Sequence, residues 1–125
     1  MLKFLQIIKS YWLSLTIIVF IAITFLSLWP LPQLPSVPGT DKTHHLIAYA
    51  VLAFPVAIRR PEKWLWIVLF FIVYSGFIEL VQPYVNRYGE WLDMAANTSG
   101  VICGLLLSEI MNRMILSLHN RKEKS

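Results

Sequence analysis

Four apolar runs, separated by short polar connections, dominate the pattern of residues along the chain. They cover residues 11–29, 44–58, 64–82 and 91–118. The first run carries no charge and matches the roughly 20 residues that an α-helix needs to cross a bilayer. The second run is shorter and contains Pro55, which should kink its helix or thin one end of it. The pattern predicts an all-α integral membrane bundle of four transmembrane helices.

The limits of these helices follow from where the apolar runs start and stop. Four prolines within residues 30–41 favour an extended link, and Pro83 ends the third run. Polar residues in the far half of the fourth run indicate an amphipathic tail. We expect a single domain at 1–125, with helices at about 8–29, 42–59, 63–82 and 91–112 and a cytoplasmic tail at 113–125.

Composition also favours a membrane protein. The chain is 57% hydrophobic and 14% charged, whereas soluble domains are about 25% charged. Lys3 and Lys9 precede the first run, as in a secretory signal peptide. However, its apolar core exceeds the roughly 7–15 residues of a signal peptide, and no small-x-small cleavage site follows. We therefore expect the first helix to be retained.

The basic residues fall mostly on one side of the predicted bundle. Nine lie on that side and two on the other: Lys3, Lys9, Arg59, Arg60, Lys63, Arg113, Arg121, Lys122 and Lys124 against Lys42 and Arg87. The positive-inside rule then places both termini in the cytoplasm and the connections at 30–41 and 83–91 outside. The net charge of +4 comes from these clusters, so we expect no nucleic-acid partner. The single Cys103 excludes an intramolecular disulfide.

Polar residues gather where the second helix begins, in the stretch DKTHHLIAYA at 41–50. Asp41, His45 and Tyr49 are spaced four apart and therefore share one helix face, with Lys42 beside it. Charged groups at a membrane boundary are costly, so this stretch is expected to anchor the helix, bind a ligand or take part in chemistry.

The third helix carries an acid close to the same outer boundary. Glu79 lies about one turn inside the helix end and shares a face with Gln82, three residues later. An unpaired carboxylate there costs about 2–3 kcal/mol. We therefore expect Lys42, Arg87 or a protonated His45 to pair with Glu79.

The fourth helix presents a matching polar stripe. Asp93, Asn97, Gly100 and Gly104 follow at intervals of four, three and four residues, which places them on one face. A Gly-x-x-x-Gly pair lets a second helix approach closely, so this face should point into the bundle.

Four motifs carry a resemblance to a known family: D-K-x-x-H at 41–45, E-x-x-Q at 79–82, R-x-x-x-x-x-D at 87–93 and D-x-x-x-N-x-x-G at 93–100. Together they resemble the VanZ family, small bacterial membrane proteins named for a member that gives low-level teicoplanin resistance. The resemblance covers about 41–104 and implies four transmembrane helices and a role in the cell envelope, without a known reaction. The positions it implies are Asp41, Lys42, His45, Glu79, Gln82, Arg87, Asp93, Asn97 and Gly100. His44 is extra to the pattern, and YVNR stands where the family often has a Pro-Gly turn.

A binding role and a structural role both suit the polar residues. In a structural role they would cap helices, snorkel or join neighbouring helices. In a binding role, Lys42 and Arg87 would hold a phosphate or carboxylate. Gln82 and Asn97 would contact sugar hydroxyls or amides. Membrane lipids, a lipid-linked precursor or a lipoglycopeptide would suit this arrangement.

An enzymatic role is the alternative. His45 would act as general acid or base, oriented by Asp41 or Asp93, in hydrolysis or group transfer on a lipid-linked phosphate or cell-wall precursor. No serine or cysteine stands in the outer cluster as a nucleophile. We expect no cofactor, and no metal, because adjacent His44 and His45 point about 100° apart on a helix.

The sequence therefore predicts a VanZ-like, multi-pass protein of the bacterial cytoplasmic (inner) membrane. We expect it to recognise an amphiphilic or lipid-linked ligand at the outer leaflet and to affect susceptibility to teicoplanin-type glycopeptides. The ligand, any catalysed reaction and the oligomeric state stay open.

Overall fold

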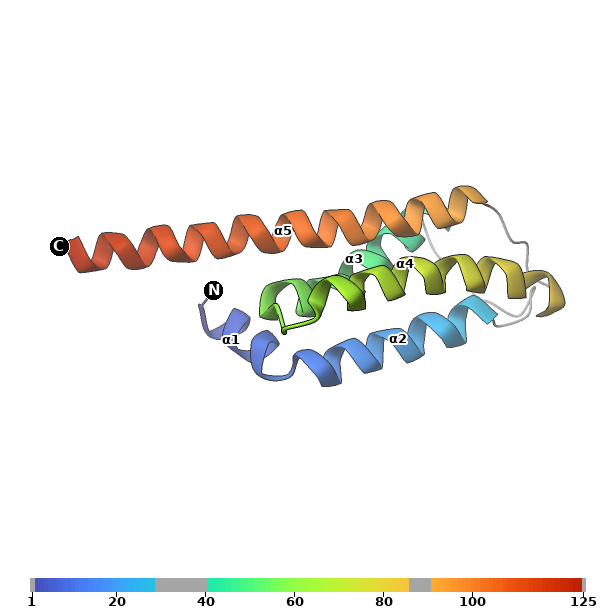
Figure 1. Cartoon of the computed structure of the whole chain (residues 1–125), viewed down its shortest axis with the longest axis horizontal. Coiled ribbons are helices and arrows are strands. Elements are labelled where there is room, and N and C mark those ends of the chain that lie inside the picture. The colour runs from blue at the N-terminus through green and yellow to red at the C-terminus, as the bar shows by residue number, and fades with distance from the viewer. Residues whose placement is uncertain (1, 29–40, 86–90, 125) are drawn as a thin grey trace.

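The computed structural model describes residues 2–28, 41–85 and 91–124, and every element in these ranges is helical. The elements are α1 (Leu2–Ser10), α2 (Trp12–Leu28), α3 (Asp41–Arg59), α4 (Trp64–Val81), the short 3₁₀ helix η1 (Gln82–Val85) and α5 (Trp91–Lys124). The all-α prediction is confirmed. In Figure 1, α2, α3, α4 and α5 lie side by side and alternate in direction, so the ends of α2 and α4 meet the beginnings of α3 and α5.

The described residues contain two helices that are long and apolar enough to cross a membrane, namely Trp64–Tyr84 and α5. The bent pair of α1 and α2 would supply a third span, and Thr43–Arg59 is a shorter apolar helix. Many large apolar side chains are exposed around the bundle, among them Ile18, Phe25 and Val73. Contiguous apolar surface of this kind indicates contact with lipid. The chain is therefore a helical membrane protein.

The first helix differs from the expected range of 8–29. The chain forms two helices that meet at Tyr11, with an angle of 74° between them. The reason lies in α1, where Leu5 and Ile8 are buried against Ile58. A straight helix would carry these two side chains away from that contact.

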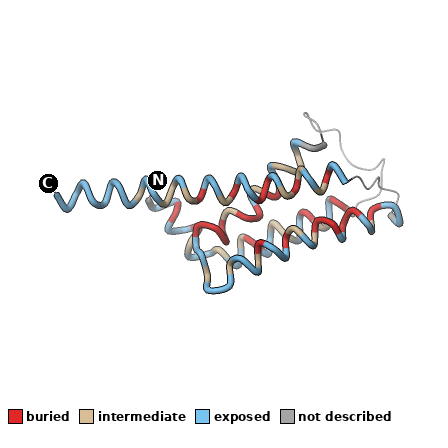
Figure 2. Tube along the Cα trace, turned by 45° about the horizontal axis from the view of Figure 1, so that its top comes forward, coloured by how far each residue is buried: buried red, intermediate tan, exposed pale blue. Residues whose placement is uncertain are grey.

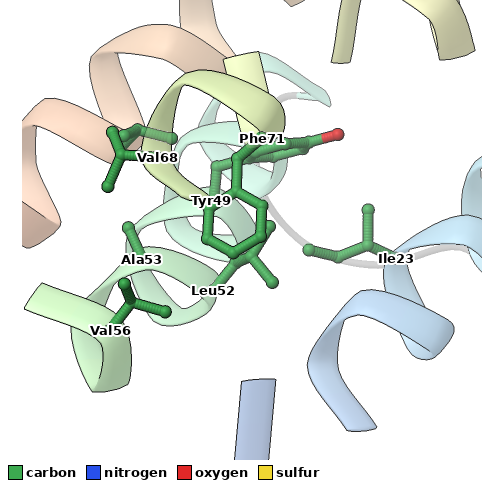
Figure 3. Packing of buried hydrophobic residues seen from close by; sticks show 8 residues of the cluster. Ile23, Tyr49, Leu52, Ala53, Val56, Val68 and Phe71 are labelled. Carbon is green, nitrogen blue, oxygen red and sulfur yellow. The ribbon is translucent and has the colours of Figure 1, made fainter. Parts of the chain in front are cut away.

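The core centres on α3. Leu52, Ala53 and Val56 of α3 are fully buried, and Ile23 of α2 and Phe71 of α4 pack in the same cluster (Figure 3). Figure 2 shows the buried positions concentrated on α3 and on the parts of the other helices beside it. Only Ile47 and Val51 among the large apolar side chains of α3 are exposed, so most of this helix faces its neighbours and it can carry a mixed composition.

Two glycines bring α5 into close contact with α3. A Cβ at Gly100 would overlap the carbonyl oxygen of Leu46 and lie 2.9 Å from its carbonyl carbon. A Cβ at Gly104 would lie 2.8 Å from the carbonyl oxygen of Ala50. Because both neighbours are backbone atoms, only glycine permits this approach.

Where an amphipathic tail is expected at 113–125, α5 continues as a helix without a break to Lys124 and projects beyond the bundle (Figure 1). Close to where the projecting part of α5 begins, Glu109 pairs with Arg60, and with Arg113 at 2.8 Å. Arg60 also stacks over Trp64 at 5.6 Å. The i,i+4 pair with Arg113 and the pair with Arg60, which lies in the connection before α4, support the helix in a region that mixes polar and apolar residues.

Candidate functional site

The predicted polar residues come together at the end of the bundle where α3 and α5 begin and where α2 and α4 end (Figure 1). Each position is set by helix spacing. On α5, Asp93 and Asn97 stand one turn apart and directly precede Gly100, so the same close packing buries all three. Their side chains therefore face α3 and not lipid.

His45 of α3 and Asp93 of α5 face one another across this contact. Their Nε2 and Oδ2 atoms are 3.8 Å apart, and their side chains are only 16% and 10% exposed. This distance allows an ion pair when the imidazole is protonated, but it is longer than a hydrogen bond. A water molecule or a polar ligand atom that bridges the imidazole and the carboxylate would hydrogen-bond to both groups. Asp93 also lies in the first turn of α5, where the helix dipole favours a negative charge.

Asn97 lies one turn deeper and is 1% exposed. Its Oδ1 atom is fully buried and has no hydrogen-bond partner among the residues that the structure describes. A buried carbonyl group left in this state costs about 1–3 kcal/mol. Asn97 is therefore costly for the fold unless a donor from outside the described residues reaches it.

Gln82 is the second amide at this end and is also 1% exposed. Its Nε2 donates to the backbone carbonyl oxygen of Ser27 on α2, at 3.1 Å. This bond fixes the orientation of the amide, because only the nitrogen can donate. The Oε1 atom therefore faces the other way as an acceptor, and none of the described residues donates to it.

Tyr49 and Glu79 complete the buried polar layer. Tyr49 lies one turn after His45 and is 1% exposed, and Glu79 is 5% exposed. The phenol is close enough to the Glu79 carboxyl group for a direct electrostatic interaction. The Tyr49 hydroxyl also lacks a hydrogen-bond partner within the described ranges. The end of the bundle thus holds more buried acceptors than the described donors satisfy.

Three predicted residues cannot be placed in this site. Asp41 and Lys42 form the first turn of α3, but their side chains lie outside the description. Arg87 lies outside the described residues altogether. His44, the histidine extra to the motif, is half-buried. The pairing expected between Glu79 and Lys42, Arg87 or His45 therefore stays a prediction.

The structure adds one partner that the sequence did not suggest. Ser27 contributes its backbone carbonyl group to the site, through the bond from Gln82. Every residue has a carbonyl group, so no side-chain pattern could have indicated this one. Within the described part of the chain, no group of three or more histidine, cysteine or acidic residues is arranged to hold a metal ion.

An apolar outer surface, antiparallel helices and a buried polar layer at one end define a helical membrane protein with a polar site inside its bundle. The sequence matches the VanZ/LLP1 family model over residues 2–112. The chain belongs to this family, and the match extends beyond the motifs to include α1 and α2. Comparison with curated proteins and with solved structures gives no match.

Proposed function

We propose that this chain recognises the polar head of an amphiphilic or lipid-linked ligand at the outer leaflet of the bacterial cytoplasmic membrane. In this proposal α2, α3, α4 and α5 each cross the bilayer, and both ends of the chain lie in the cytoplasm. The observations that carry the proposal are the buried acceptors on Gln82 and Asn97 and the 3.8 Å separation of His45 and Asp93, all at the same end of the bundle.

The length of α3 supports its place as a fourth span. Its 19 residues extend about 29 Å, close to the roughly 30 Å thickness of the hydrocarbon core. It lies antiparallel to α2 and α4 and at the same level in the bundle (Figure 1). Its polar first turns then reach one membrane boundary, and Arg59 reaches the other.

Aromatic side chains support placing the polar end at the headgroup level. Tyr84 follows α4 and Trp91 begins α5, and both are strongly exposed. Tyrosine and tryptophan concentrate at membrane–water interfaces, where the ring contacts acyl chains and the polar atom meets water. A ligand with a polar head and an acyl tail would then place its head beside His45 and Asp93 and its tail in lipid.

The buried acceptors define what such a head must offer. The oxygen atoms of Gln82 and Asn97 need hydrogen-bond donors, and hydroxyl, amide or ammonium groups of a cell-wall precursor or glycopeptide supply them. Donation to atoms already removed from water recovers about 1–3 kcal/mol each. Recognition of this kind would alter susceptibility to teicoplanin-type glycopeptides, either by holding the drug or by holding its lipid-linked target.

The test uses a Gram-positive host that expresses the full chain. Teicoplanin and vancomycin susceptibility are measured for the wild type and for Asp93→Asn and His45→Gln variants, at matched membrane abundance. Ser99→Ala is the control, because Ser99 is exposed on the same helix and bonds only within it. Protection against teicoplanin that both site variants lose and Ser99→Ala keeps would support the proposal. Unchanged susceptibility with abundant wild-type protein would refute the resistance part of it.

An enzymatic role has one specific observation in its favour. A carboxylate beside an imidazole, as at His45 and Asp93, is an arrangement that orients a general base. Reconstituted protein would be incubated with a lipid-linked pyrophosphate, and binding and turnover would be measured separately. In an enzyme, His45→Gln should abolish turnover and keep binding, whereas a binding protein should show no turnover in either form.

A further inference from the structure

At the opposite end of the bundle, α1 lies across the direction of α2. The two helices make an angle of 74°. The 17 residues of α2 extend about 26 Å, which is near the length needed to cross the hydrocarbon core without α1. If α2 runs along the membrane normal, α1 runs close to the membrane plane.

One side of α1 is fixed to the protein. Leu5 and Ile8, three residues apart, are buried in a small cluster with Ile58 of α3, and Met111 and Ile115 of α5 pack against it. This contact holds α1 at the level where α3 ends. The helix is therefore a fixed part of the bundle surface.

A second side of α1 is apolar, and the described parts of the bundle leave it exposed. Phe4 and Ile7 are 60% and 57% exposed, and Tyr11 continues the strip at a spacing of four. In α2, which follows directly, Leu13 and Ile17 are exposed as well. Lipid that surrounds α2 therefore also reaches this strip.

The remaining side of α1 is polar and basic. Lys3, Gln6 and Ser10 are exposed and lie on the side away from Leu5, and Lys9 borders them. The end of α3 and the connection to α4 add Arg59 and Lys63 at the same end, both exposed. Glu62 is exposed in the same connection, whereas Glu109 of α5 is already paired with Arg60 and Arg113.

We propose that α1 is an interfacial helix that docks on an anionic phospholipid surface, with Phe4, Ile7 and Tyr11 in the acyl boundary and Lys3 and Lys9 on the headgroups. An apolar side combined with lysines on the polar side is the arrangement by which amphipathic helices bind such a surface. Basic residues close to the membrane are attracted to anionic lipid, with an effect of about fivefold in affinity for each lysine. The lysines favour an anionic surface over a neutral one, and the exposed apolar side chains that α2 adds beside the strip favour lipid over a protein partner.

The experiment uses the full chain in nanodiscs with Cys103→Ser as background, since Cys103 is a free, exposed thiol on α5. A fluorophore is attached to Ile7→Cys, on the apolar strip, or to Gln6→Cys, whose side chain points about 100° away on the polar side of α1. We expect bromine on the acyl chains to quench the label at position 7, and aqueous iodide to quench the label at position 6. Labels that iodide quenches equally would overturn the proposal and leave the strip for a protein partner.

The role of charge is tested with the same label at position 7. Quenching by brominated phosphatidylglycerol, relative to brominated phosphatidylcholine, measures the preference for anionic lipid. Changing both Lys3 and Lys9 to Gln should lower this preference by about fivefold for each lysine. The matched control changes Lys122 and Lys124 to Gln, on the projecting part of α5, and should leave the preference nearly unchanged (Figure 1). Equal quenching by the two lipids in the wild type would overturn the electrostatic part.

Discussion

The contact between α3 and α5 gives the sharpest prediction, because it depends on a single hydrogen atom at Gly100. In Gly100→Ala the new Cβ would overlap the carbonyl oxygen of Leu46 and lie 2.9 Å and 3.0 Å from its carbonyl carbon and Cα. Ordinary contacts of this type need about 3.5–4.0 Å. The atoms in the way belong to the backbone of α3, so no side-chain rotation relieves the overlap. The two helices must separate or shift.

The expected cost combines two opposing effects. Forcing a methyl group into a close-packed interface costs about 1–3 kcal/mol, and a rigid backbone neighbour places Gly100→Ala at the upper end. Alanine recovers up to about 1 kcal/mol because it favours helix more than glycine does. We therefore expect the unfolding free energy to fall by about 2 kcal/mol.

Gly76→Ala is the matched control for this experiment. It has the same chemistry and the same gain in helix propensity, but the new Cβ would meet Met94 Cε and Sδ at 3.1 Å and 3.2 Å. A methionine side chain can rotate aside, so the change in stability should stay below about 1 kcal/mol. Reversible unfolding of the purified protein in mixed micelles, followed by tryptophan fluorescence, measures both variants. Equal stability of the two variants would refute the argument that Gly100 sets the distance between α3 and α5.

The same unfolding assay tests three further variants. Tyr74→Phe removes the hydrogen bond between the Tyr74 hydroxyl and Thr24, so it should lower stability by about 0.6 kcal/mol, the average for such bonds between membrane helices. Tyr49→Phe removes a buried hydroxyl that has no hydrogen-bond partner among the described residues. The unfolding free energy should therefore be unchanged or higher. A clear loss of stability would mean that this hydroxyl is hydrogen-bonded within the folded protein. Gln82→Met removes the bond to the carbonyl group of Ser27, and we expect a loss of about 1 kcal/mol together with retained folding in the membrane.

The sequence predicted those features of the fold that depend on periodicity. The apolar runs indicated an all-α protein, which the helical structure confirms. The spacing of Asp93, Asn97, Gly100 and Gly104 placed them on one face, and all four are buried on the side of α5 next to α3. The spacing carries this information because residues three or four apart on a helix face the same neighbour.

Features that depend on partners distant in the sequence could not be predicted in this way. The break at Tyr11 arises because Leu5 and Ile8 pack against α3 and α5, and no residue at the break itself favours a bend. The helical continuation of α5 depends partly on Glu109, which is bound by an arginine from the connection between α3 and α4. Local composition near residue 112 shows only a mixture of polar and apolar residues, which suits a tail as well as a helix.

The polar site and the helix packing depend on the same distance. His45 is one residue before Leu46, whose carbonyl group touches Gly100, and Asp93 is two turns before Gly100 on the other helix. A separation of α3 and α5 at Gly100 would therefore widen the 3.8 Å gap between His45 and Asp93. In a binding site for a small polar group, such a change loses the contacts of both side chains at once, because hydrogen bonds weaken steeply with distance. Gly100→Ala should thus impair function even under conditions where the variant is fully folded, whereas Gly76→Ala should not.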